Sequence, residues 1–117
     1  MSTSVTFAES QLREALQWIA WPVDRQKELY STVQEWVSVA VELTENLVDD
    51  VLPWVEAELG STWSVSQRGA LEALVREIAA CSDNPEIWYD QNSLLDPEWE
   101  LFRSLASAAL TAFGWSS

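Results

Sequence analysis

Residues 29–51 read LYSTVQEWVSVAVELTENLVDDV, and this stretch decides the fold class. Its apolar residues recur at spacings of three and four, which places them along one face of an α-helix. We predict that this helix extends from Asp24 to Leu52, about 43 Å at 1.5 Å per residue. Pro53 is expected to break or kink it, because proline lacks an amide N–H and its ring clashes with the carbonyl of Asp49. The apolar face consists of Leu29, Val33, Trp36, Val37, Ala40, Leu43, Leu47, Val48 and Val51.

Start and stop signals on either side of this stretch predict three further main helices. Pro22 ends the first of them and Gly114 the last, and Gly60 stops a short helix that begins at Pro53. Each predicted start pairs a capping residue with a suitable partner. These pairs are Thr6 with Glu9, Ser64 with Gln67, and Asp96 with Pro97.

The expected architecture is an all-α compact bundle of four main helices plus one or two short helices. Residues 82–95 show no sustained period and predict a long loop with one helical turn after Pro85. We expect a disordered N-terminus over residues 1–5 and a single helical domain over residues 6–117.

Charge sets the strongest limit on partners, because the chain has 19 acidic and only 6 basic residues and its formal net charge is −13. Nucleic-acid phosphates and anionic membrane surfaces would repel this chain, since both are bound through clustered Lys and Arg. A basic protein or peptide is attracted, and its approach is faster at low salt. We predict such a partner, with no direct nucleic-acid contact and no membrane contact. Solubility alone is the other explanation of the charge.

The predicted location is the cytoplasm. The N-terminus lacks the basic start and apolar run of a signal peptide, and no apolar run approaches the roughly 18 residues of a membrane span. The single cysteine, Cys81, cannot form an internal disulfide, which excludes a disulfide-stapled secreted scaffold.

The acidic residues are concentrated where no base can neutralise them, since no Lys or Arg occurs between Lys27 and Arg68. Residues seven apart lie almost two helical turns apart, so a set with this spacing forms one ridge on the predicted long helix. We predict that this ridge, together with Glu45, is a docking surface for a basic partner; an ordinary solvated face is the alternative. The ridge consists of Glu28, Glu35, Glu42 and Asp49.

The chain has eight tryptophans, several of them at predicted helix breaks. Such residues either wedge helix ends together or anchor a partner, because indole faces attract Arg and Lys. The run Trp88-Tyr89-Asp90 combines aromatic faces with a carboxylate in a predicted loop. These three residues are our predicted contact with a basic side chain.

Enzymatic chemistry finds little support in the sequence, which has no histidine. Cys81 lies in an apolar run typical of a helix core, and it lacks a histidine that would activate it. Zinc sites and helical di-iron sites also depend on histidine. We therefore predict no catalytic residue, no metal and no cofactor.

Together these features predict a non-catalytic protein-binding module that masks, inhibits or escorts a basic partner through an acidic, Trp-rich surface. Immunity proteins, inhibitors and assembly chaperones are the types that fit. The first alternative is a nucleic-acid mimic that occupies the basic groove of a DNA- or RNA-binding protein, and the second is a small metal-dependent enzyme. A homodimer stays open, although like charges oppose it.

Overall fold

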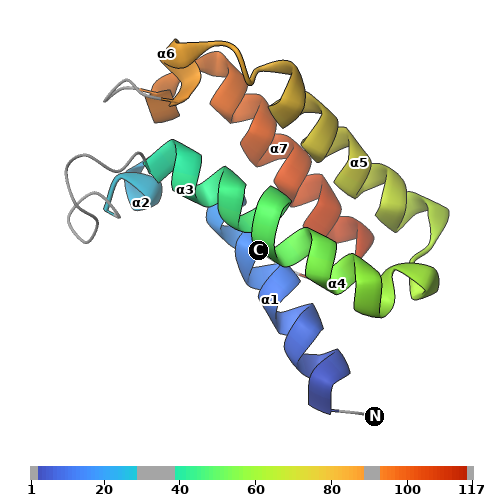
Figure 1. The fold of residues 1–117 in the computed structure, drawn as a ribbon. Coiled ribbons are helices and arrows are strands. Elements are labelled where there is room, and N and C mark those ends of the chain that lie inside the picture. The colour runs from blue at the N-terminus through green and yellow to red at the C-terminus, as the bar shows by residue number, and fades with distance from the viewer. Residues whose placement is uncertain (1–2, 29–38, 89–92, 116–117) are drawn as a thin grey trace.

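The computed structural model describes residues 3–28, 39–88 and 93–115, and within these ranges the backbone is mainly helical and has no β-strand (Figure 1). The prediction of a compact all-α bundle is confirmed. Glu35, Trp36, Tyr89 and Asp90 lie outside the described residues. The elements are α1 (Thr3–Ala20), α2 (Val23–Glu28), α3 (Val39–Glu45), the π-helical segment η2 (Asn46–Val51), α4 (Leu52–Leu59), the 3₁₀ turn η3 (Gly60–Thr62), α5 (Val65–Ala80), α6 (Pro85–Trp88), the 3₁₀ turn η4 (Ser93–Leu95) and α7 (Pro97–Ala112).

The core is built around α7, which packs against α1 and against α5 (Figure 1). Its apolar residues recur at helical spacing, and those that face its neighbours are buried, as the sequence predicts. They include Trp99, Phe102, Ala106, Ala109 and Leu110. Trp99 is completely buried and lies edge-on to Phe102, with ring centroids 5.2 Å apart.

Local signals at the helix ends act as the sequence predicts. The Ser64 hydroxyl accepts a hydrogen bond from the Gln67 amide, and the Gln67 side chain accepts one from the Ser64 amide, which completes a capping box. The Asp96 carboxylate accepts a hydrogen bond from the Glu98 amide ahead of Pro97. Gly114 follows α7 with φ = 75°, a conformation that favours glycine.

One predicted start is displaced. Helix α1 begins at Thr3 rather than at Thr6, so helical backbone covers three of the residues that the sequence assigned to a disordered terminus. The C-terminal end of α1 falls at Ala20, just before Pro22, as expected.

The predicted break at Pro53 is not seen, because helical backbone continues from Val39 through Leu59. Proline cannot donate to the carbonyl one turn before it, and here the helix widens into η2 directly ahead of it. The Leu52 amide accordingly donates to the Leu47 carbonyl, five residues back, and Pro53 lies in the first turn of α4. The helix therefore accommodates Pro53 with a π-helical segment. Of the predicted long helix, Val23–Glu28 and the part from Val39 onward are described as helical.

A buried polar link joins α2 to α7. Gln26 is completely buried, and its Nε2 donates to the carbonyls of Trp18 and Ile19, both at 3.0 Å. Its Oε1 accepts a hydrogen bond from Arg103 Nε at 2.9 Å, and Arg103 also donates to the Leu94 carbonyl. The pair thus satisfies the open C-terminal carbonyls of α1 and fixes α2 against α7.

None of the described helices combines the length and the apolar character that crossing a membrane requires.

Candidate functional site

A groove with a volume of about 230 Å³ lies between the α3–η2 helix and the C-terminal end of α5. Val41, Val48 and Ile78 give it apolar walls, and the carboxylate-bearing Glu45 and Asp49 belong to its lining. No Lys or Arg is among the described residues that line it. An apolar groove with acidic lining suits the apolar stem and charged head of a Lys or Arg side chain.

The sequence places these side chains through helical spacing. Glu45 and Asp49 are four residues apart, so they lie on neighbouring turns of one helix side. The adjacent side of the same helix carries the buried Leu43, Leu47 and Val51. Because that apolar side is packed in the core, the acidic side is left exposed and turned toward α5.

Trp88 forms part of the groove wall rather than projecting from a loop. The residue is 6% exposed, and its Nε1 donates to the Cys81 carbonyl at 2.9 Å. One ring face stacks on Phe102, with centroids 5.8 Å apart and planes 16° apart. Trp88 is therefore a core residue that borders the groove, with one ring face covered by Phe102, and its contact with a basic side chain stays a prediction.

The structure thus brings Glu45, Asp49 and Trp88 together out of the eight predicted contact residues. Glu42 is exposed on α3 but does not line the groove, and Glu28 is the last described residue of α2, which does not line it either. The predicted ridge is not verified as one line, because Glu35 is outside the described residues. Moreover, the wider turn of η2 changes the angle between Glu42 and Asp49 that regular heptad spacing implies.

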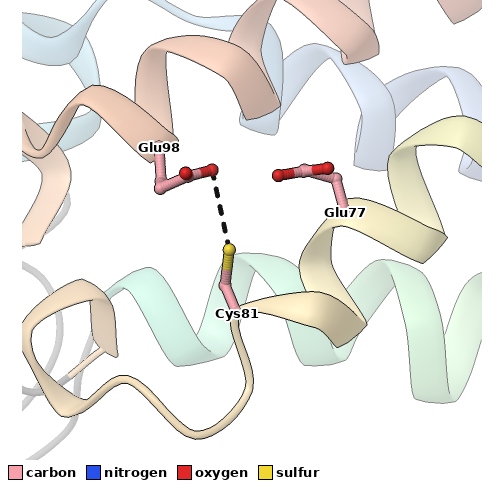
Figure 2. A group of neighbouring side chains, drawn as sticks. All are labelled: Glu77, Cys81 and Glu98. Atoms are coloured by element: carbon pink, nitrogen blue, oxygen red, sulfur yellow. Dashed lines mark hydrogen bonds between the residues drawn. The ribbon is translucent and has the colours of Figure 1, made fainter.

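A second cluster was missed by sequence reasoning: Glu77, Cys81 and Glu98 meet where the end of α5 faces the first turn of α7 (Figure 2). One donor atom from each residue lies within 4.8 Å of the others. Figure 2 shows the carboxylates of Glu77 and Glu98 pointing toward each other. The Sγ atom of Cys81 lies 3.6 Å from Oε2 of Glu98. The spacing of Glu77 and Cys81 was a visible signal, but the position of Glu98 depends on the tertiary fold.

The surroundings of this cluster raise the pKa values of Glu77 and Cys81, so both groups keep their protons to higher pH. The pKa of Glu77 is raised from its usual value of 4.5 by a hydrogen bond with Glu98, by burial and by repulsion from the Glu98 charge. Burial, followed by the Glu98 charge, raises the pKa of the Cys81 thiol to about 11. The thiol is therefore protonated at neutral pH and is a poor nucleophile, since the thiolate is the reactive form.

The same three side chains include donor types that bind Zn²⁺ in proteins. A metal would first have to displace the Cys81 proton, because only the thiolate is a ligand. The sequence-based prediction that the chain binds no metal stays a prediction.

Replacing Glu98 by Gln is expected to stabilise the protein at neutral pH and to flatten the pH dependence of its stability. The raised pKa of Glu77 means that the folded state holds this proton more tightly than the unfolded state does. The stability that this proton contributes is present in full below the pKa of an unfolded Glu side chain, and it is lost as the pH rises through the folded pKa of Glu77. Urea unfolding of wild type and Glu98→Gln at a series of pH values from acidic to neutral measures the difference.

Glu100→Gln is the matched control, because Glu100 is an exposed acid in the same first turn of α7. It removes the same charge from the helix N-terminus without touching Glu77. Parallel stability curves for wild type and Glu98→Gln would show that the two carboxylates do not interact.

Comparison of the chain with protein-family models, with curated proteins and with solved structures gives no match. Its function is therefore argued from its own geometry and charge.

Proposed function

We propose that this chain is a non-catalytic protein-binding module that masks, inhibits or escorts a basic partner protein. The groove between α3–η2 and α5 is the observation that carries the proposal. It combines apolar walls with Glu45 and Asp49, and the sequence has no Lys or Arg between Lys27 and Arg68. Immunity proteins, inhibitors and assembly chaperones of basic proteins are the types that fit, with the cytoplasm as the proposed location.

Binding then has two physical stages. The net charge of −13 attracts a basic partner and speeds its approach at low salt. An apolar side chain or a Lys or Arg stem then enters the groove between Val41, Val48 and Ile78, while its charged head meets Glu45 or Asp49. The first stage raises the association rate, and the contacts of the second stage determine which partner is bound.

Reversing the groove charge with Glu45→Lys and Asp49→Lys is expected to weaken partner binding by about 10- to 100-fold, because each lysine replaces an attraction with a repulsion. The partner is first obtained by capture on the immobilised chain and elution with salt. Its dissociation constant is then measured by calorimetry with wild type and variant. The melting temperature should change little, since both residues are exposed.

Glu14→Lys with Glu100→Lys serves as the control, because it changes the net charge equally on exposed positions of α1 and α7 that do not line the groove. Equal weakening by both pairs would reduce the role of the groove to bulk charge. Displacement of the chain from its partner by duplex DNA or RNA would instead identify it as a nucleic-acid mimic.

A further inference from the structure

Phe7 and Trp54 are the exposed aromatic residues of the described part of the chain, and they form a pair between α1 and α4. Phe7 is 55% exposed and Trp54 is 39% exposed, and their ring centroids lie 5.7 Å apart in an edge-on arrangement. Two neighbouring exposed aromatic side chains form an apolar patch on the surface, and such patches are typical of interaction sites. Neither ring belongs to the lining of the groove.

Carboxylates flank this pair. Glu58 lies one helical turn after Trp54 within α4, and Asp50 lies about one turn before it at the end of η2. Both side chains are exposed, and neither forms an ion pair within the described part of the chain. An aromatic face bordered by unpaired carboxylates is complementary to a cation.

The protein's own arginines show the kind of contact that a cation makes with its indole rings. Guanidinium groups lie over three indole rings: Arg25 over Trp21 at 4.2 Å, Arg68 over Trp63 at 5.5 Å and Arg103 over Trp99 at 5.8 Å. Among the described residues no such cation lies over Trp54. A planar guanidinium can stack on an indole face while it donates hydrogen bonds to a carboxylate, which a lysine ammonium cannot do as well.

We propose that Phe7 and Trp54, with Asp50 and Glu58 at their border, form a second docking surface that takes an arginine side chain of a basic protein. The arginine stacks on the open face of Trp54 and bonds to Glu58 or Asp50. A second copy of this chain is a poorer occupant, because two chains of net charge −13 repel each other. The surface is distinct from the groove and does not depend on it.

Two probes test the surface: a peptide of alternating glycine and arginine, and the same peptide with lysine at every arginine position. Both carry the same charge, so a difference between them reports on stacking rather than on bulk attraction. Wild type is expected to bind the arginine peptide about two- to fivefold more tightly, the range of an exposed cation–π contact. Trp54→Ala should bind both peptides equally, and Asp50→Asn with Glu58→Gln should weaken both.

Indole N–H signals in ¹⁵N-correlated NMR spectra locate the contact. The signal missing in Trp54→Phe belongs to Trp54, and it is expected to shift when the arginine peptide is added to wild type. Val65→Ala is the control variant, since Val65 is 91% exposed on α5 and should leave the preference intact.

Two results would overturn the proposal: an arginine preference that survives in Trp54→Ala, or a Trp54 signal that does not respond to the arginine peptide. The groove variant Glu45→Lys with Asp49→Lys separates the two surfaces. If that variant loses the arginine preference while Trp54→Ala keeps it, the groove is the arginine site and this second surface is refuted without refuting the groove.

Discussion

Trp99→Ala is expected to lower the free energy of unfolding by about 4 kcal/mol, the range for removing a buried tryptophan. Trp99 is completely buried on α7, the helix that packs against both α1 and α5. Its ring lies edge-on to Trp88 and Phe102, and its Nε1 donates to the Ile87 carbonyl at 3.1 Å. The substitution opens a cavity at the centre of the bundle and leaves that carbonyl without its donor. Urea unfolding followed by circular dichroism measures the loss.

Two further variants make this test specific. Trp99→Phe keeps an aromatic ring but loses the hydrogen bond to Ile87, so we expect an intermediate loss of about 2 kcal/mol. Trp54→Ala removes an exposed tryptophan and should cost less than about 1 kcal/mol. If Trp99→Ala proves no more damaging than Trp54→Ala, α7 is not the centre of the core. Because small domains have only about 5–15 kcal/mol of stability, Trp99→Ala consumes a large share of it.

Arg103→Met is expected to cost about 3 kcal/mol, although methionine fills much of the same volume. The Oε1 atom of Gln26 loses its donor inside the protein, and the Leu94 carbonyl loses the hydrogen bond that Arg103 donates to it. An unsatisfied buried acceptor keeps its full desolvation cost, which is larger than the net gain from an ordinary hydrogen bond. Thermal and urea unfolding of the variant give the difference.

A double-mutant cycle with Gln26→Leu identifies the contact that is lost. Once Gln26 is replaced, Arg103→Met no longer leaves the amide oxygen of residue 26 without a donor. The double mutant should therefore lose about 1–2 kcal/mol less stability than the sum of the two single-mutant losses. Arg25→Met is the matched control, because Arg25 is exposed and stacks on Trp21 at 4.2 Å. Additive costs for Gln26 and Arg103 would contradict the link.

Signals that act over a few residues allowed much of the fold to be predicted from the sequence. The Ser64–Gln67 capping box and the Asp96–Pro97 start need only three or four residues, and the structure has both as expected. The buried stripe of α7 follows from helical spacing in the same way. Local chemistry is sufficient in these cases because the interacting atoms belong to one helical turn.

The response to Pro53 could not be predicted in this way. Proline lowers the local preference for helix, but Leu47, Val51 and Val55 are buried on the helix that contains it. Breaking the helix would remove these side chains from the core. The π-helical segment keeps them there, although its amides donate to the carbonyl five residues back, in the rarer π-helical pattern. Tertiary packing therefore overrides the local signal.

The sites show the same division. Glu45 and Asp49 were predicted as contact residues because both lie in a stretch without bases and Asp49 continues the seven-residue spacing of the ridge. The link from Arg103 to Gln26 joins residues 77 positions apart, and that from Cys81 to Glu98 joins residues 17 positions apart. The contact of Phe7 with Trp54 likewise joins α1 to α4. The periodicity of a single sequence carries no information on contacts between residues this far apart, so these pairs could not be predicted from it.

The packing of α1 against α7 has a consequence for the rate of folding. These two helices are neighbours in the core although every helix from α2 to α6 lies between them in sequence. Bringing such distant segments together costs loop entropy before the contact repays it, so folding slows as the mean separation of contacting residues grows. This bundle should thus reach its native state more slowly than one of equal size in which each helix packs mainly on the next.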